Sequence, residues 1–378
     1  MKENIIKGPL TIGINLLYMN RKLAGGSIVY GINLVNELAK ADVKNNYILF
    51  VNKDSVDLPL SVGDNFKIKV IPFSNSHVFI RYFWEQVIFP FYLLGYKLDL
   101  LHSLGYVGPL FCPCKHIVSI LDLNYKRHAE SMSLSKKILL GSMVKLMSIF
   151  SHKIITISNF SKKEICDGLR VRSEKISVTH LSGSDDHYLE KNNNMDVKTI
   201  YNIDTDYIIA FGSSSSHKNI DGLISAFSCI KTSHPELKLL LVGHQHNNEE
   251  LNKQILKLSL DGLVSFTGFV PDEHIFPLLK SSKIFVFPSF YEGFGIPLLD
   301  AQTAGSPVAS SNAASLPEVG GFGALYFDPY NITEMSDTIL KILGSDNLKN
   351  ELLEAGLANR AKYSWKITAQ QTLDCYKV

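Results

Sequence analysis

The chain has 378 residues, of which 46% are hydrophobic and 20% charged, and its formal net charge is +2. This length exceeds the size at which a single hydrophobic core keeps growing, so it predicts two domains. The composition excludes a disordered chain, and the small net charge, without a long basic run, argues against nucleic-acid binding. Five cysteines in a chain of this length exclude a disulfide scaffold and favour a reducing compartment.

The N-terminal sequence "MKENIIKGPLTIGINLL" has no apolar segment followed by a small-residue cleavage site. No stretch of about 18 uninterrupted apolar residues occurs anywhere in the chain. We therefore expect a cytoplasmic protein that neither carries a secretory signal nor spans a membrane.

Short apolar segments alternate with helical patterns along the whole chain, which is typical of a parallel α/β architecture. We expect strands at 10–17, 47–51, 67–71, 99–103, 116–121, 153–158 and 175–180. The polar stretch 189–206 resembles a linker. Further strands are expected at 207–212, 237–243, 263–268, 283–289, 306–311 and 324–329.

These segments predict an α/β protein with two doubly wound, Rossmann-like domains that face a central cleft. The first domain is expected at 1–195, the second at 196–360, and a terminal helix at 361–378 that can cross back to the first domain. Ligands of such sheets bind at the carboxyl ends of the strands. We therefore expect the functional residues on the turns that follow the strands.

Two of these turns carry anion-binding features. Gly25 and Gly26 follow the first strand and precede a helix, where backbone N–H groups can approach a phosphate, although an ordinary strand-to-helix turn is equally favoured. In "IIAFGSSSSHKNIDG", a strand ends at Gly212 and a serine-rich loop leads to His217 and Lys218. Lys218 can neutralise a phosphate and His217 can donate a hydrogen bond, but a solvated basic pair is an equal alternative.

A third turn, in "KIFVFPSFYEGFGIPLLD", carries two carboxylates. Glu292 lies on the turn and Asp300 lies eight residues further along, in the helix that Pro297 begins. In a helix this separation corresponds to about 12 Å, too far for two acids that share a proton. The pair is better suited to holding two ends of one elongated ligand. The alternative is a turn residue together with a partner of the helix dipole.

Other sequence features have structural readings that we weighed against functional ones. Asp204-Thr205-Asp206 spells a metal-binding DxD, but it lies in the expected linker. Cys112, Cys114 and His116 alternate without a second zinc-type pair, which favours a structural thiol pair. The stretch 135–150 predicts a helix packed on a sheet rather than a membrane-surface helix. The aromatic stretch 79–97, which Pro90 interrupts, is expected either to pack internally or to contact a lipid-linked acceptor.

In chain order, these motifs resemble the retaining glycosyltransferases of family 4, which have the two-domain GT-B fold. The matching segments are "GGSIVY", "DLLHS", "ITISNFSKKEI" and "HKN". The most specific match runs from "FTGFVPDEH" through "FPSFYEGFGIPLLDAQTAG" to "LPEVGGFGALYFDP". The sequence as a whole is most similar to bacterial mannosyltransferases of polysaccharide assembly.

The resemblance implies a role for each matching residue. Lys218 would hold the diphosphate of a nucleotide-sugar, with Gly25, Gly26, Gly212 and His217 lining the same donor site. Glu292 would contact the donor sugar beside Gly293 and the N–H groups of Phe294, Gly295 and Ile296. Asp300 would bind the ribose, and Val270 and Asp272 would border the base. In the first domain, Asp122 would be catalytic and His102 would face the acceptor.

Three positions depart from the family pattern: Asp300 stands for the usual glutamate, His217 for an arginine, and Leu121 for a histidine. The expected activity is that of a metal-independent hexosyltransferase without a cofactor. It would move mannose from GDP-mannose to a lipid-linked saccharide, in peripheral contact with the inner face of the cytoplasmic membrane. The alternatives are a non-catalytic nucleotide-sugar-binding protein and an epimerase or phosphorylase of the same fold.

Overall fold

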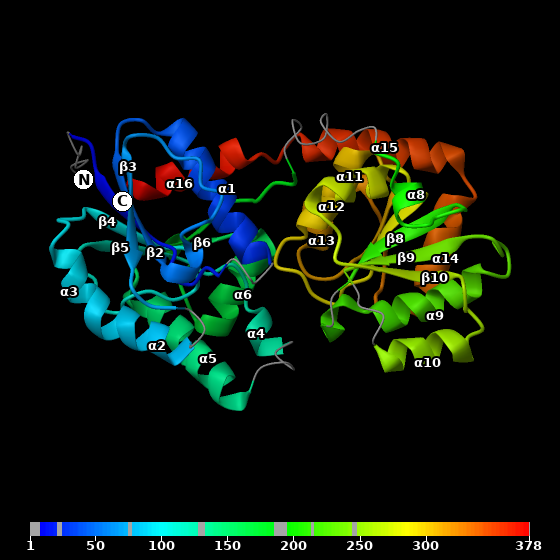
Figure 1. Ribbon diagram of the computed structural model, residues 1–378, viewed down its shortest axis with the longest axis horizontal. Helices are drawn as coiled ribbons and strands as arrows, with labels where there is room; N and C mark the ends of the chain where they lie inside the picture. The colour runs from blue at the N-terminus through cyan, green and yellow to red at the C-terminus, as the bar shows by residue number, and fades with distance from the viewer. Residues whose placement is uncertain are drawn as a thin grey trace. The chain divides into compact units, whose positions relative to one another are not determined.

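The structure is a computed structural model that describes residues 8–20, 25–74, 78–127, 133–184, 195–212, 215–243 and 248–377. Contacts divide the chain into two compact units. Unit 1 comprises Met1–Leu181 together with Trp365–Val378, and unit 2 comprises Ser182–Ser364. In Figure 1 the colour runs along the chain, from blue at the N-terminus to red at the C-terminus.

Unit 1 is built on a seven-stranded parallel sheet in the order β3-β2-β1-β4-β5-β6-β7. Its strands are β1 (Thr11–Asn15), β2 (Asn46–Asn52), β3 (Phe66–Ile71), β4 (Leu100–Ser103), β5 (Lys115–Ser119), β6 (Lys153–Thr156) and β7 (Ile176–Val178). The order reverses between β1 and β4, which is the switch point where ligands of doubly wound sheets bind.

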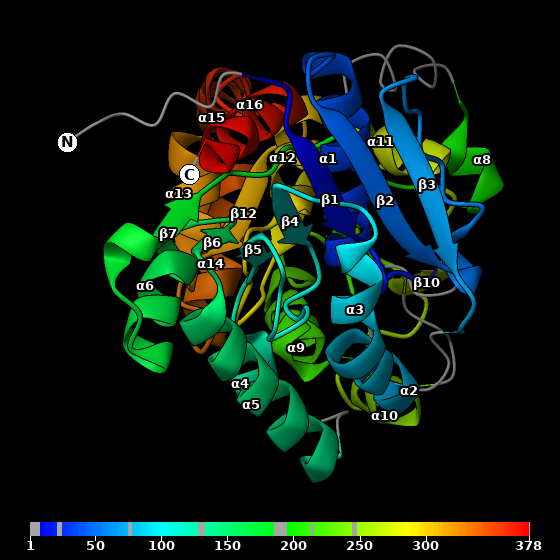
Figure 2. The same cartoon turned by 90° about the vertical axis from the view of Figure 1, so that its left-hand side faces the viewer.

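The helices of unit 1 cover both faces of this sheet (Figures 1 and 2). They are α1 (Gly26–Ala41), η1 (Lys53–Ser55), α2 (Val78–Phe83), the π-helical turn η2 (Trp84–Ile88), α3 (Phe89–Leu94), α4 (Asn124–Arg127), α5 (Leu134–Phe150), α6 (Asn159–Leu169), η3 (Ser173–Lys175) and α16 (Trp365–Tyr376). The helical segment continues through Pro90, because this proline lies in the first turn of α3, where a missing N–H is harmless.

Unit 2 has a six-stranded parallel sheet in the order β10-β9-β8-β11-β12-β13, with its switch point between β8 and β11. The strands are β8 (Tyr207–Phe211), β9 (Lys238–Val242), β10 (Val264–Gly268), β11 (Ile284–Phe287), β12 (Val308–Ser311) and β13 (Leu325–Phe327). The helices are α8 (Val197–Ile200), η4 (Ser216–Lys218), α9 (Ile220–Ile230), α10 (Glu249–Lys257), α11 (Asp272–Lys280), α12 (Ile296–Ala304), α13 (Leu316–Gly320), η5 (Gly321–Gly323), α14 (Ile332–Leu343) and α15 (Asp346–Arg360).

The core of unit 2 has one apolar layer on each side of the sheet. Successive residues of a strand point to opposite faces, so Ile208 packs into the layer of α9 and α14, and Ile209 packs into the layer of α11 and α12. Strands buried on both faces read as continuous apolar runs in the sequence. That pattern allowed all of the described strands to be located, with ends within a few residues of those expected.

The division between the units falls at 181/182 and 364/365, whereas the sequence placed it at 195/196 and 360/361. Within the expected linker, residues 189–194 lie outside the described residues. Val197 and Ile203, by contrast, are buried in the core of unit 2. The C-terminal helix α16 packs against α1 of unit 1. Across the described parts of the chain, no helix is both long enough and apolar enough to cross a membrane.

Candidate donor site

The switch point of unit 2 brings two predicted residues into contact. Lys218 lies at the end of η4, in the segment that follows β8, and Glu292 lies on the turn that follows β11. Because β8 and β11 are hydrogen-bonded neighbours, their carboxyl ends meet at the same edge of the sheet. The ammonium of Lys218 is 2.6 Å from Oε1 of Glu292, and the two side chains are only 22% and 14% exposed. The sequence placed both residues at this edge but did not predict their direct contact.

The Glu292 carboxylate is held in place by a second donor. The buried hydroxyl of Ser289 donates a hydrogen bond of 2.8 Å to the same Oε1 atom. The ammonium of Lys218 also lies 5.5 Å from the ring centroid of Phe287, within the range of a cation–π contact. An ammonium has three donor hydrogens, so Lys218 can keep Glu292 and still bind an anion such as a phosphate.

Asn219 is a structural residue of this site that the sequence did not single out. It adopts a left-handed conformation with a φ of 53° between η4 and α9, and its side chain is 2% exposed. Its Nδ2 donates to the carbonyl oxygens of Pro288 at 3.1 Å and Pro329 at 2.9 Å. Asn219 therefore ties the lysine loop to the glutamate turn. The asparagine of the "HKN" motif was the only signal, since asparagine tolerates left-handed backbone better than most residues.

Two serines hold the backbone of the turn that carries Glu292 by hydrogen bonds to its carbonyl oxygens. The hydroxyl of Ser315 lies 2.8 Å from the carbonyl oxygen of Glu292 and 2.9 Å from that of Phe294. Ser311 donates to the carbonyl of Ser289 at 2.6 Å. The serine-rich stretch before "LPEV" is thus explained by hydrogen bonding, because buried carbonyls in a turn need side-chain donors.

The turn ends at Gly295, which precedes the first residue of α12. Its φ of 106° and ψ of 49° suit glycine only, and an added Cβ would lie 2.7 Å from Cδ2 of Leu316. The N–H groups at a helix start have no partner within the helix and carry partial positive charge. The predicted donor contacts of Phe294, Gly295 and Ile296 therefore lie at a helix N-terminus directly after Glu292.

Asp300 lies on α12, and its carboxylate is engaged within unit 2. Its Oδ1 accepts a hydrogen bond of 2.7 Å from the backbone N–H of Ser184. Burial, with a smaller contribution from the charge of Asp272, raises the pKa of Asp300 to about 6. The contact with ribose remains a prediction, and in this structure the Ser184 amide occupies one of the carboxylate oxygens.

The remaining donor-site residues of unit 2 lie around the same sheet edge. Gly212 follows β8 and donates its N–H to the carbonyl of Val242 at 2.9 Å. The backbone carbonyl of His217 accepts from the N–H of Phe290 at 2.8 Å, which again joins the two loops. Val270 is 6% exposed and packs into the apolar core, whereas Asp272 is exposed at the start of α11. Only Asp272 thus presents a polar side chain where the base was predicted.

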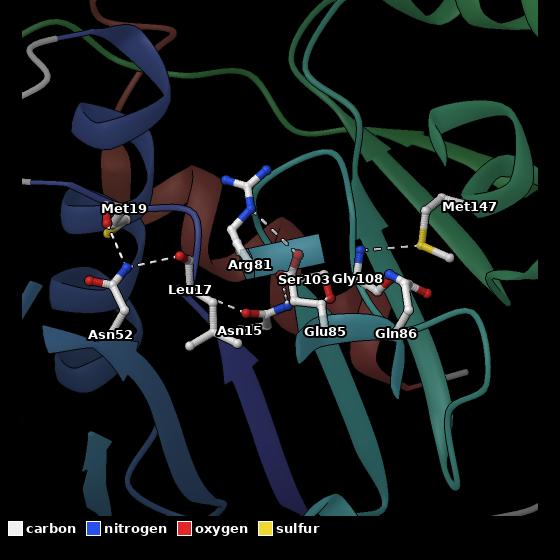
Figure 3. A network of polar contacts seen from close by, with 10 residues as sticks. All are labelled: Asn15, Leu17, Met19, Asn52, Arg81, Glu85, Gln86, Ser103, Gly108 and Met147. Atoms are coloured by element: carbon white, nitrogen blue, oxygen red, sulfur yellow. Dashed lines mark hydrogen bonds and ion pairs between the residues drawn. The ribbon is translucent and has the colours of Figure 1, made fainter. Parts of the chain in front are cut away.

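In unit 1, Gly25 and Gly26 lie at the N-terminus of α1, after the switch-point strand β1. An added Cβ at either residue would meet no atom within 4 Å, so the backbone here is open to approach. The same edge carries a buried polar cluster in which Nδ2 of Asn15 donates to Glu85 at 3.1 Å and to Ser103 at 3.3 Å (Figure 3).

Asp122 accepts hydrogen bonds of 3.0 Å from the hydroxyl of Tyr106 and from the N–H of Asn124. The preceding residue, Leu121, is only 4% exposed. Leu121 is therefore part of the interior, while the carboxylate of Asp122 next to it is held by two hydrogen bonds.

The structure places His102 in the interior of unit 1, not at a surface open to an acceptor. The side chain is 0% exposed. Its Nδ1 lies 2.8 Å from the hydroxyl of Tyr376, and its Nε2 lies 2.9 Å from Oγ of Ser119. Burial, reinforced by His116, lowers its pKa to about 3, so the ring is neutral. Tyr376 comes from α16, at the other end of the chain, so residues near His102 could not reveal this contact.

The DxD sequence and the cysteine pair, which the sequence analysis interpreted as structural, contact other side chains of the protein. Asp204 pairs with Lys238 and Asp206 with Lys283. The Cys112 and Cys114 sulfurs lie 3.5 Å apart, and both cysteines are free. Within the part of the chain that the structure describes, no group of three or more histidine, cysteine or acidic side chains could hold a metal ion.

Residues 193–358, which contain Lys218, Glu292 and Asp300, match the family described as glycosyl transferases group 1. The chain therefore carries a glycosyl transferases group 1 domain. This domain coincides with most of unit 2.

Curated relatives that the chain resembles include two mannosyltransferases of Escherichia coli. O-antigen chain mannosyltransferase B is 33% identical over 230 residues, which cover 60% of each chain. The serotype-specific mannosyltransferase WbdA is 28% identical over 230 residues, which cover 58% of this chain and 28% of the relative. The matched part thus spans about three fifths of one relative and just over a quarter of the other.

A solved structure with the same fold is a glycosyltransferase from Rickettsia africae. It aligns with a TM-score of 0.72 at 16% identity and covers 98% of both chains. Together with the seven- and six-stranded parallel sheets, this alignment confirms the predicted fold of two doubly wound α/β domains of GT-B type.

Proposed function

We propose that the protein transfers mannose from GDP-mannose to a saccharide acceptor, with retention of the anomeric configuration. The observation that carries the proposal is the Lys218–Glu292 pair, which lies beside a helix N-terminus at the switch point of unit 2. The choice of mannose rests on the names of the two E. coli relatives. The O-antigen chain in the name of the first relative supports a lipid-linked acceptor at the inner face of the cytoplasmic membrane.

The chemistry follows from where negative charge develops. As the bond between the anomeric carbon and the diphosphate breaks, the leaving oxygen gains charge. Lys218 and the N–H groups of Gly295 and Ile296 would stabilise that charge. The acceptor hydroxyl then bonds to the anomeric carbon and gives its proton to the leaving phosphate. In this proposal Glu292 orients the sugar hydroxyls and does not attack carbon, and no metal or cofactor takes part.

The test begins with donor binding. A thermal-shift screen of the full chain with GDP-mannose and with UDP-, ADP- and dTDP-sugars should give the largest stabilisation with GDP-mannose. A ligand at 100 times its Kd stabilises the folded state by about 2.7 kcal/mol, which is readily measured. Stabilisation by another nucleotide-sugar alone would contradict the choice of donor and leave the class of enzyme intact.

Transfer is tested with the donor that binds, together with lipid-linked and free saccharide acceptors. The product should contain an α-linked sugar if an α-linked donor is used, because the configuration is retained. The variant Glu292→Ala should lose transfer, and transfer at the wild-type rate would refute the assigned site.

A second candidate function is nucleotide-sugar binding without turnover. The observation that favours it is Leu121, a buried apolar residue where the resembling family has a histidine. Donor stabilisation without transfer to any acceptor, and without any other turnover of the donor, would support this candidate. Donor turnover that needs no saccharide acceptor would instead support an epimerase or a phosphorylase.

A further inference from the structure

The segment formed by α2, η2 and α3 has the opposite polarity from a water-exposed helix. Its two charged side chains point inward: Arg81 is 12% exposed, and Glu85 is 2% exposed. Nε of Arg81 lies 3.6 Å from Oε2 of Glu85, and the other oxygen of Glu85 accepts from Asn15, as the sticks in Figure 3 show. Surface helices normally bury their apolar side and expose their charges.

The outward-facing side chains of this segment are large and apolar. We call them the outer face; its members and their exposed fractions are Phe79 60%, Ile80 50%, Phe83 61%, Val87 47%, Ile88 42%, Phe91 70%, Tyr92 37% and Leu94 57%. The three phenylalanines alone leave on the order of 400 Å² exposed. Single exposed apolar residues are ordinary, but a patch of this size marks an interaction surface.

The underside of the same segment is already packed, so the outer face is not a core that failed to close. Phe89 and Leu93 are buried in a cluster with side chains of β2, β3 and β4, and Tyr82 packs in a cluster with Met143 and Met147 of α5. Figures 1 and 2 both show α2 and α3 along the outside of unit 1. A partner of the outer face therefore comes from outside the described part of unit 1.

Among the described residues from 66 to 98, the exposed charged side chains are all lysines. From residue 66 to residue 98 the only acidic residue is the buried Glu85. Lys67 and Lys69 are exposed on the edge strand β3, and Lys97 is exposed just after α3. Lys67 and Lys69 share the side of the sheet on which Ile71 packs with α3, because alternate residues of a strand point the same way. A basic rim on an apolar face complements the anionic headgroups of a membrane.

A bilayer suits this surface better than a protein partner. Protein interfaces form about one hydrogen bond per 100–200 Å². Among the eight side chains of the outer face, only Tyr92 has a polar group, and its hydroxyl is already bonded to that of Tyr96 at 2.8 Å. Acyl chains require no hydrogen bonds.

We propose that the outer face docks unit 1 on an anionic phospholipid bilayer. Phe79, Phe83 and Phe91 lie at the boundary between headgroups and acyl chains, and the neighbouring lysines contact headgroup phosphates. This inference does not depend on the proposed transferase activity. It adds to that activity the surface by which a lipid-linked acceptor is reached.

The test is co-sedimentation of the full chain with vesicles of phosphatidylethanolamine and phosphatidylglycerol, and with vesicles of phosphatidylcholine alone. The wild-type protein should pellet with the anionic vesicles, less so at high salt, and bind phosphatidylcholine several-fold more weakly. The variant Phe79→Ser/Phe83→Ser/Phe91→Ser should bind the anionic vesicles at least tenfold more weakly.

The matched control is Phe322→Ser/Leu357→Ser/Leu256→Ser, which removes side chains of unit 2 that are 91%, 54% and 64% exposed. It should bind vesicles as the wild type does. A wild-type protein that stays in the supernatant would overturn the proposal, and so would a control that loses as much binding as the outer-face variant. An oligomer that only the outer-face variant disrupts, seen by ultracentrifugation, would show that the face is covered by a second copy of the chain instead.

A second variant protects the test against misfolding. Lys67→Glu/Lys69→Glu changes only exposed side chains of an edge strand. It should weaken binding to the anionic vesicles several-fold and leave the thermal unfolding temperature unchanged. Unchanged binding of this variant would refute the basic rim. Because no donor or acceptor is present, a failure here leaves the transferase proposal untouched, and an inactive enzyme leaves the docking surface untouched.

Discussion

Replacing Gly295 by alanine tests whether the start of α12 must approach Leu316 as closely as the structure shows. The backbone at Gly295 has a φ of 106°, which costs a non-glycine residue on the order of 1–3 kcal/mol. The new Cβ would lie 2.7 Å from Cδ2 of Leu316 and 3.3 Å from Cε1 of Phe287, and such overpacking costs about 1–3 kcal/mol. The two costs together predict that unit 2 loses about 2–6 kcal/mol of stability.

Gly305, at the other end of the same helix, provides the matched control. It also has a positive φ, 72°, but an added Cβ would meet nothing within 4 Å. The variant Gly305→Ala should therefore show the backbone cost alone, roughly 1–2 kcal/mol. The difference between the two variants reports the crowding at the helix start together with the less favourable φ of Gly295.

The assay must resolve the two units. Both tryptophans, Trp84 and Trp365, lie in unit 1, so their fluorescence in urea serves as an internal reference. Hydrogen exchange of the β11 and β12 amides reports on unit 2. Gly295→Ala should speed this exchange and weaken binding of the nucleotide-sugar, whereas Gly305→Ala should leave binding nearly unchanged. Equal losses of stability and binding in both variants would refute the assignment of a crowded helix start to the site.

Three further predictions concern charge and protonation. The variant Lys218→Met should lower kcat for transfer about 10²–10³-fold, because it removes positive charge at the leaving group. Glu292→Gln keeps the hydrogen bond to Ser289 and should lower kcat less. A smaller loss of kcat in the lysine variant would contradict these roles. Because burial raises the pKa of Asp300 to about 6 from 3.8, its contribution to stability is present below pH 3.8 and lost as pH rises through 6, by up to about 3 kcal/mol. Unit 2 of Asp300→Asn should lack this pH dependence in thermal unfolding, and an unchanged profile would reject the shift. The lowered pKa of His102 acts in the opposite direction: its contribution is present above pH 6.5 and is lost as pH falls towards 3. Tyr376→Phe removes the 2.8 Å hydrogen bond to that ring. It should lower the free energy of opening, measured by hydrogen exchange of the α16 amides, by about 1–3 kcal/mol. Unchanged exchange would show that this hydrogen bond does not stabilise α16.

Local sequence patterns predicted the strands of both units and several of their helices. Apolar runs such as "KLLLV" and "IFVF" are typical of strands buried on both faces, and Gly295 with Pro297 marks the start of a helix. Motif spacing also placed Lys218 and Glu292 at strand ends. These signals are local, so they could be read from neighbouring residues alone.

Only the tertiary structure decided which of these residues touch. Lys218 meets Glu292 because β8 and β11 pair across the switch point, a neighbour relation between residues 74 apart in the chain. Asp300 binds the amide of Ser184, and His102 is buried by Tyr376 from the last helix. The sequence singled out the aromatic stretch 79–97, which contains the outer face, but it left internal packing and contact with a lipid-linked acceptor equally open. Which of its side chains face water depends on how each helix lies on its sheet, and that is set by packing between distant parts of the chain.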